Sequence, residues 1–350
     1  MKHLNIYKNE NFNSKSLTSY ITEYIINKKL DTSINSEGKY HPQTKEELIE
    51  NIKECFNDDN YDLNCIDTRS ITDMSNLFEN ILYIYKNFDV SKWDVSNVTN
   101  MTSMFNSCKY FNCDLSGWDV SNVKIMDYMF LWCESFEGKG LENWDVSNVT
   151  NMGYMFANCP KFEGKGLENW DVSNVKNMFC MFTECEKLNC DLSNWNVSKV
   201  ENMSYAFYKC NKFTGKGLEN WNVSNVTNMN FMFNSCRNFN SDLSNWDVSN
   251  VEDMESMFYR CKDLNFNLSN WNVSKVKNMK CMFTCCNNFT GKGIENWDVS
   301  KVENMASMFY GCSKFKGKGL ENWNVSNVKD MNYMLEGCTL IKNKPSWYKE

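Results

Sequence analysis

The stretch WDVSNVTNM occupies residues 93–101 and recurs letter for letter at residues 144–152. Such a stretch is either a binding motif copied twice or the marker of a regularly repeating unit. Aligning the chain on Trp decides between the two, because ten Trp residues follow one another at intervals of 25 or 26 residues. They are Trp93, Trp118, Trp144, Trp170, Trp195, Trp221, Trp246, Trp271, Trp297 and Trp323. The stretch therefore marks the pitch of a repeat array.

Two apolar spacings recur in every unit. Trp93 and Val95 alternate with polar residues, which is typical of a short strand. Met101, Met104 and Phe105 then follow at intervals of three and one, the spacing of one face of a helix. These spacings predict a strand, a turn and about two turns of helix in each unit. A unit this short cannot bury its apolar residues alone, so the units must stack. We predict an α/β, leucine-rich-repeat-like right-handed solenoid of about eleven coils.

The array is predicted to span residues 61–341, because a divergent first unit precedes the ten units that contain Trp and has Ile66 at the Trp position. Residues 342–350, which include Pro345, are expected to form a C-terminal tail or cap, since proline is a poor strand partner.

Residues 1–60 are predicted to form a helical N-terminal cap, because an open end of such an array would recruit other chains. Thr44 and Glu47 form a capping box at the start of one helix, TKEELIENIKECF. Upstream, SLTSYITEYIINKKL (16–30) carries apolar residues at helical spacing and predicts a second helix.

The 26-residue units differ from the others by a Gly-Lys-Gly sequence ahead of the Trp, first seen at Gly138 to Gly140. We interpret these glycines as turn residues that allow positive φ. An anion-binding loop is the alternative, but the Ser or Thr that follows the Lys in a phosphate-binding loop is missing.

Charge and hydropathy exclude several classes of function. The net charge is −7, with 37 basic and 44 acidic residues, so there is no electrostatic footprint for nucleic acid. No apolar run reaches the roughly 18 residues of a membrane span, and the first residues lack the apolar stretch of a secretory signal. From the sequence we therefore expect no membrane insertion and a cytoplasmic location. Sequons such as Asn97-Val98-Thr99 recur inside the repeats. Glycans there would obstruct stacking, which argues against a eukaryotic secretory route.

A cysteine follows each Trp by fifteen residues. These cysteines are Cys108, Cys133, Cys159, Cys185, Cys210, Cys236, Cys261, Cys286, Cys312 and Cys338. We interpret them, with the ten Trp residues, as a structural core ladder of reduced, buried thiols, because free cysteine is among the most buried residue types. A disulfide or metal ladder is the alternative, but the spacing of zinc ligands and a nearby His are missing.

The residue after each Trp is Asp or Asn. The acidic members form one candidate binding face, made of Asp94, Asp119, Asp145, Asp171, Asp247 and Asp298. The alternatives are a solvated face without function and a Ca²⁺-binding row, although the spacing differs from that of known calcium coils. No other cofactor is expected. A Ser follows two residues later in all ten units, but a nucleophilic Ser needs a base, and both His3 and His41 lie outside the array. We expect no catalytic residues and no enzymatic activity.

Aromatic residues appear where the units disagree. They form a second candidate contact surface, on or beside the side that we predict to be helical, made of Tyr128, Trp132, Tyr154, Tyr205, Phe231, Tyr259 and Tyr310, with Phe179, Tyr208 and Tyr333 at related positions. The alternative is simple packing between coils, but aromatic residues are also enriched among the residues that dominate binding energy.

The run MFNSCKYFNCDLSGWDVSNV (104–123) resembles the BspA-type leucine-rich repeat surface proteins, in particular their branch with the repeat W-D-V-S-N-V-x-N-M-x-x-M-F-x-x-C. The resemblance covers about 280 residues and is repeated ten times. It implies a leucine-rich-repeat-like solenoid and a role in adhesion or protein recognition at the cell surface.

The leading hypothesis is a non-enzymatic scaffold that binds a protein partner. A carbohydrate-binding adhesin or enzyme that uses the acidic face is the competing hypothesis, and a purely structural repeat protein is the third.

Overall fold

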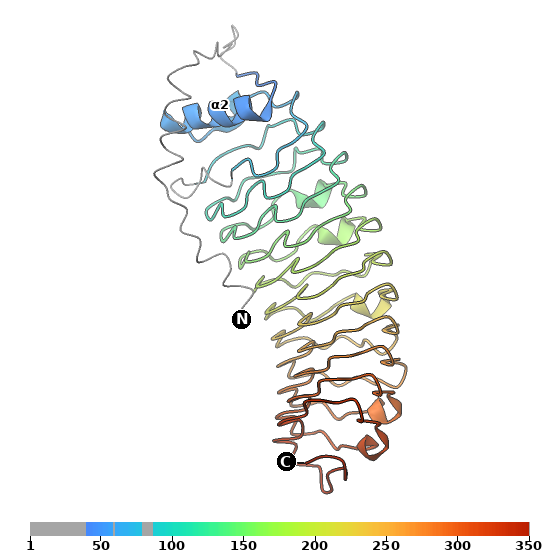
Figure 1. Cartoon of the computed structure of the whole chain (residues 1–350). Coiled ribbons are helices and arrows are strands. Elements are labelled where there is room, and N and C mark those ends of the chain that lie inside the picture. The colour runs from blue at the N-terminus through green and yellow to red at the C-terminus, as the bar shows by residue number, and fades with distance from the viewer. Residues whose placement is uncertain (1–39, 59, 79–86, 350) are drawn as a thin grey trace. The chain divides into compact units, whose positions relative to one another are not determined.

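The computed structural model describes residues 40–58, 60–78 and 87–349. Its contacts divide the chain after His41, into Met1–His41 and Pro42–Glu350. The second unit contains a stack of coils with helix α2 (Lys45–Asn57) at its N-terminal end (Figure 1). The second predicted helix, at residues 16–30, lies outside the described residues. The helical cap at residues 1–60 was predicted as a separate region, whereas the contacts group α2 with the coils.

Helix α2 begins as the capping box predicts. The Thr44 hydroxyl accepts a hydrogen bond from the backbone N–H of Glu47 at 3.2 Å. The Glu47 carboxylate accepts one from the backbone N–H of Gln43 at 2.7 Å. The Lys45 ammonium donates to the Ser75 hydroxyl of the first coil at 2.7 Å. The apolar face of the helix is buried and consists of Leu48, Ile52, Cys55 and Phe56. The helix therefore covers the N-terminal end of the stack.

The coils differ from the predicted strand-turn-helix unit. Among the described residues of the coils there is neither an extended strand nor an α-helix. Each coil instead forms a single parallel β-bridge with each neighbour, in a series from Asp73 and Asn100 to Asn304 and Asp330. The repeated, stacked units are thus present, but the prediction of a strand and a helix in each unit is wrong.

Positions in a coil can be counted from its Trp as position 0. We call positions 0 to 7 the Trp segment and positions 8 to 15 the ladder segment. In the ladder segment, the N–H groups at positions 8, 10, 12 and 14 donate to carbonyls of the next coil. Met101 N, for example, lies 3.0 Å from Ile125 O. The N–H groups at positions 11, 13 and 15 donate within their own coil to the carbonyl three residues earlier, as Cys108 N does to Phe105 O at 3.0 Å.

The alternation of these bonds explains why the spacing resembled a helix. Positions 10 and 14 have left-handed backbone, as at Ser103 (φ 54°) and Ser107 (φ 64°). Each left-handed residue ends one turn, so the chain advances in successive three-residue turns. These turns bury Met101, Met104 and Phe105 on one side, as a helix would. Every second N–H then points along the stack, which an α-helix does not allow.

The predicted core residues form continuous rows. All ten Trp residues are buried, and each indole N–H donates to a backbone carbonyl of the preceding coil, as Trp118 Nε1 does to Val90 O at 3.0 Å. All ten Cys residues of the ladder are buried with free thiols. From Cys133 onward, each thiol contacts the carbonyl of a Phe in the preceding coil, as Cys210 Sγ does with Phe182 O at 3.0 Å. Burial raises the pKa of the Cys210 thiol well above its usual value.

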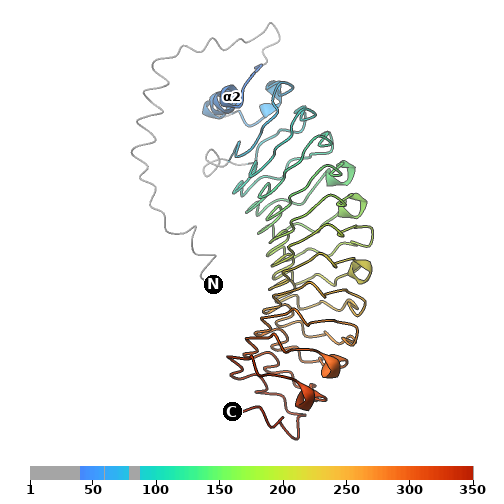
Figure 2. The same ribbon diagram turned by 45° about the vertical axis from the view of Figure 1, so that its right-hand side comes forward.

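The 26-residue coils carry a short 3-10 turn immediately before the Trp. These turns lie on one side of the stack (Figures 1 and 2) and are η3 (Leu141–Asn143), η4 (Leu167–Asn169), η5 (Leu218–Asn220), η6 (Ile294–Asn296) and η7 (Leu320–Asn322). The glycine before each turn has positive φ, as predicted, with Gly140 at 93°. A Cβ on Gly140 would lie 2.1 Å from the backbone nitrogen of Ser116. The glycine therefore also permits the close approach of the preceding coil.

The C-terminal residues continue the stack further than predicted. The Trp347 indole donates to Leu320 O at 3.0 Å. Each of the ten core Trp residues makes the same bond with the preceding coil. Residues 342–350 were expected to form a tail or cap, whereas Trp347 occupies the Trp position of a further, incomplete coil. Within the described ranges, no helix has both the length and the apolar character needed to cross a bilayer.

Candidate functional site

The acidic row has a structural role in every unit. The side-chain oxygen of each Asp or Asn at position 1 accepts a hydrogen bond from the backbone N–H two residues later. For example, Asp119 Oδ1 accepts from Ser121 N at 3.0 Å, and Asn196 Oδ1 accepts from Ser198 N at 3.1 Å. The predicted acidic residues make this bond without exception; they are Asp94, Asp119, Asp145, Asp171, Asp247 and Asp298. An Asn side-chain oxygen meets the same requirement, which explains why either Asp or Asn occurs at position 1.

The hydrogen bonds also affect the acidity of the row. The hydroxyl and the backbone N–H of Ser121 hold the pKa of Asp119 below its usual value, and Ser173 does the same for Asp171. Within residues 40–58, 60–78 and 87–349, no three His, Cys, Asp or Glu side chains gather where they could hold a metal ion.

The aromatic residues of the middle coils form a continuous row. Tyr128 stacks on Tyr154 with ring centroids 4.7 Å apart, and Tyr205 stacks on Phe231 at 4.5 Å. Phe179 joins the two pairs, with edge-on contacts of 5.0 Å to Tyr154 and 6.1 Å to Tyr205. We call these five residues the aromatic row. It crosses five successive coils, and each of its side chains is half-buried.

The fold does not require aromatic residues at these places. Four members of the row occupy position 10, where the other coils have Asn76, Ser103, Cys180, Ser256, Cys281, Ser307 and Tyr333. Position 10 has positive φ, from 56° at Phe231 to 61° at Tyr128. The same left-handed backbone occurs at position 10 in every described coil, so it belongs to the repeat and does not depend on an aromatic side chain. The touching rings are what distinguish these coils, and they make the aromatic row the strongest candidate surface.

The other predicted aromatic contacts lie beside the row or apart from it. Trp132 occupies position 14, is 45% exposed and also has positive φ. Tyr259 and Tyr310 occupy position 13 in later coils, and among the described residues neither makes a ring contact with the row. Tyr208, also at position 13, does touch it, 5.6 Å from Tyr205. Of the predicted aromatic contacts, the structure thus brings together six: Tyr128, Tyr154, Phe179, Tyr205, Tyr208 and Phe231.

Charged side chains border the aromatic row on one side. Lys209 forms an ion pair with Glu184 at 2.5 Å, and its ammonium lies 5.0 Å from the ring centroid of Tyr208. Burial raises the pKa of Tyr205 to about 12. Its hydroxyl, like that of an ordinary tyrosine, is protonated at neutral pH and can donate a hydrogen bond. The row therefore combines apolar rings with hydrogen-bond donors and a cation, a composition typical of protein interfaces.

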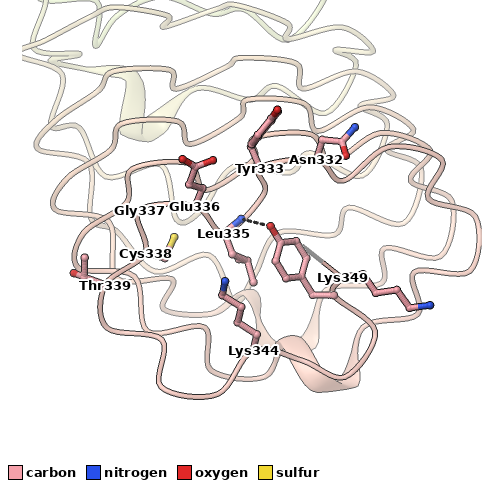
Figure 3. A pocket seen from close by; sticks show the side chains of 10 residues that line it. Asn332, Tyr333, Leu335, Glu336, Gly337, Cys338, Thr339, Lys344 and Lys349 are labelled. Atoms are coloured by element: carbon pink, nitrogen blue, oxygen red, sulfur yellow. Dashed lines mark hydrogen bonds between the residues drawn. The ribbon is translucent and has the colours of Figure 1, made fainter.

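A shallow hollow of about 520 Å³ lies at the C-terminal end of the stack (Figure 3). It is lined by Tyr333, Glu336 and Lys344, among others. The backbone N–H of Leu335 contacts the Tyr348 hydroxyl at 3.5 Å, whereas the corresponding N–H groups of inner coils meet carbonyls of a following coil. The hollow therefore lies where Leu335 N–H meets a side-chain hydroxyl in place of a backbone carbonyl of a following coil. The sequence does not predict this hollow.

Comparison with known proteins gives a family but no activity. A family model described as "Mycoplasma protein of unknown function, DUF285" matches residues 47–140, 132–218, 202–292 and 279–348. No curated protein matches the chain. Among solved structures, "Crystal structure of TLR13-ssRNA13 complex" is similar at 12% identity and a TM-score of 0.19. That match covers 84% of this chain and 56% of the other, and its TM-score is too low to support an argument.

Proposed function

We propose that this chain, which belongs to the DUF285 family over residues 47–348, is a non-enzymatic scaffold that binds a protein partner through the aromatic row. One observation carries the proposal. Five successive coils place touching aromatic rings at the surface, and four of these rings stand at position 10, where Ser103, Ser256 and Ser307 serve the fold in other coils. Aromatic side chains that are not needed for folding are the usual anchors of protein interfaces.

A repeat scaffold suits this role because its surface is long and each coil contributes one element of it. The half-buried rings are already held by their neighbours, so little side-chain entropy is lost when a partner binds. Adhesion, which the BspA-type resemblance implies, would be one use of such a surface. The competing proposal of a carbohydrate-directed adhesin or enzyme on the acidic face has less support, because each Asp already serves a turn.

The test compares two double variants with a matched control. Tyr128→Ser with Tyr154→Ser, and Tyr205→Ser with Phe231→Ser, remove ring pairs and introduce the residue that other coils carry at position 10. Tyr259→Ser with Tyr310→Ser removes two aromatic residues outside the row. Partners captured from cell and surface extracts by the wild-type chain are identified by mass spectrometry, and their affinity for each variant is then measured by surface plasmon resonance.

We expect each row variant to bind at least about 10-fold more weakly, since anchor residues contribute about 2 kcal/mol or more. The control should bind within about 3-fold of wild type, because most interface positions contribute little. Equal binding by the row variants and wild type, with thermal unfolding showing that all variants are folded, would exclude the aromatic row as the site.

A further inference from the structure

The junction between α2 and the first coil brings two cysteine sulfurs into contact. Cys55 lies in the last turn of α2 and is buried. Cys65 ends the 3-10 turn η2 (Leu63–Cys65), directly before the first coil, and is half-exposed. Their Sγ atoms lie 3.6 Å apart. In the part of the chain that the structure describes, no other two cysteine sulfurs are in contact.

We propose that Cys55 and Cys65 are a modification site, at which a small-molecule disulfide such as oxidised glutathione forms an intramolecular disulfide that fastens the N-terminal cap to the first coil. A disulfide bond is about 2.05 Å long, so the sulfurs must approach by about 1.5 Å. Rotation of the Cys65 side chain on its short turn is the simplest way to close that gap.

The other cysteines lack one or the other of the two requirements. The cysteines of the core ladder are buried, and from Cys133 onward their thiols contact Phe carbonyls rather than sulfur. Cys281 and Cys285 are half-exposed, but within the described ranges neither touches a second sulfur. Only the pair at the cap combines an accessible thiol with a neighbouring one.

The reaction proceeds by two thiol–disulfide exchanges. The Cys65 thiolate attacks one sulfur of oxidised glutathione, whose S–S bond breaks, and one glutathione thiolate leaves and takes up a proton. Cys55 then gives its proton to water and attacks the Cys65 sulfur, and the second glutathione leaves. Two protein thiols are oxidised, and one oxidised glutathione is reduced to two thiols. Burial, and then the hydrogen bond with Cys65, raise the pKa of Cys55 to about 12, which makes Cys55 the second thiol to react.

The bond would act on the cap rather than on the whole stack. Apart from packing, Lys45 ties α2 to the first coil through its hydrogen bond to Ser75 and its contact of 3.6 Å with Asp73. A disulfide that closes a loop of this size removes chain entropy from the detached state of the cap. Oxidation should therefore keep α2 closed over the end of the stack.

The test treats the full chain with glutathione buffers of increasing oxidised fraction, then blocks free thiols and maps peptides by mass spectrometry. We expect a Cys55–Cys65 disulfide to form before any other internal disulfide. Backbone amides of α2 should exchange hydrogen about 10- to 100-fold more slowly after oxidation, as a typical disulfide predicts. Amides of the middle coils should not change.

Two variants keep the interpretation unambiguous. Cys55→Ser leaves Cys65 accessible, so glutathione should remain attached to Cys65 and α2 should gain no protection. Cys285→Ser removes a half-exposed thiol that has no sulfur neighbour and should leave the effect intact. The proposal is overturned if wild-type Cys65 accumulates as a stable mixed disulfide, or if the internal disulfide forms without slowing exchange in α2.

Discussion

The Trp segment and the ladder segment both hold each coil to its neighbours, but they do so with different groups. In the Trp segment the bonds between coils come largely from side chains, such as the Trp118 indole to Val90 O and the Asn122 amide to Ser96 O at 2.8 Å. In the ladder segment they come largely from backbone N–H groups, with the buried Cys thiols as an addition. Side-chain bonds fix the residue type, whereas backbone bonds leave the outward side chains free to vary. The aromatic row lies in the ladder segment for this reason.

The largest expected effect contrasts the two segments within one coil. Trp195→Ala removes a buried ring and leaves Leu167 O without the indole donor that lies 2.7 Å away. It should lower the free energy of unfolding by about 3–5 kcal/mol, as large-to-small core changes do. Tyr205→Ser, in the ladder segment of the same coil, should cost about 1 kcal/mol, because the ring is only half-buried and Ser is native at this position elsewhere.

Urea unfolding of the intact chain, with hydrogen exchange at the altered coil, measures both changes. Equal losses for Trp195→Ala and Tyr205→Ser would show that the two segments do not differ in their tolerance of substitution.

A gain in stability is expected where the two segments join, at position 7. Asn or Asp there accepts a hydrogen bond from the N–H two residues later, as Asn151 Oδ1 does from Gly153 N at 3.1 Å. Ile125 is the exception: it cannot accept this bond and is 37% exposed. Ile125→Asn should supply the bond to Asp127 N and raise the free energy of unfolding by about 1 kcal/mol.

The reverse change serves as its control. Asn151→Ile should lower the free energy of unfolding by a similar amount, measured by urea unfolding alongside Ile125→Asn. If Ile125→Asn is neutral while Asn151→Ile destabilises, the side-chain bond matters only in the context of its neighbours.

The sequence predicts the structure of the Trp segment better than that of the ladder segment. The sequence predicts the pitch and the buried residues of the Trp segment correctly, because Trp93 and Val95 recur unchanged. In the ladder segment the sequence wrongly predicts a helix, because successive three-residue turns and a helix bury the same residues. The left-handed backbone at Ser103 and Ser107 does not change the spacing of the apolar residues. The presence of Gly311 and Gly337 at position 14 was the one available signal of left-handed backbone.

The acidic row and the aromatic row also differ in how far the sequence predicts them. That Asp119 caps a turn could have been inferred from its exchange with Asn196, since both present the same acceptor oxygen. That Tyr128 and Tyr154 touch could not, because contact between coils depends on the turn of the ladder segment. Trp347 follows Trp323 by 24 residues, close to the repeat length, so the sequence could have predicted that Trp347 continues the row of Trp residues.

A smaller effect is expected from ion pairs between coils. The Lys139 ammonium lies 2.7 Å from Asp114 and, with Ser116, holds the pKa of that carboxyl at about 2. The unfolded value is about 3.9, so the folded state binds fewer protons. The contribution to stability is therefore present above about pH 4 and is lost as the pH falls toward 2. Because the Lys139 ammonium is exposed and the carboxylate is only half-buried, solvent screens the pair and its contribution should be at most about 0.5 kcal/mol.

NMR titration of Asp114 measures this effect directly, and Lys139→Ala should return its pKa toward the unfolded value. The pair of Asp191 and Lys216, with a pKa of about 2 for Asp191, should behave in the same way. If the pKa of Asp114 does not change in Lys139→Ala, the ion pair does not cause its low value.

The smallest effect is expected in the acidic row, which the Trp segment uses only as a set of acceptors. Asp119→Asn, Asp145→Asn and Asp171→Asn keep the oxygen that accepts the turn bond, so the combined change in the free energy of unfolding should stay within about 0.5 kcal/mol at pH 7. The corresponding Ala variants lose the acceptor and should cost about 1 kcal/mol each. If the Asn triple variant also keeps full affinity for the partner, the charge of the row serves neither folding nor recognition. If affinity falls while stability holds, part of the binding surface lies in the Trp segment, and the division between the two segments must be redrawn.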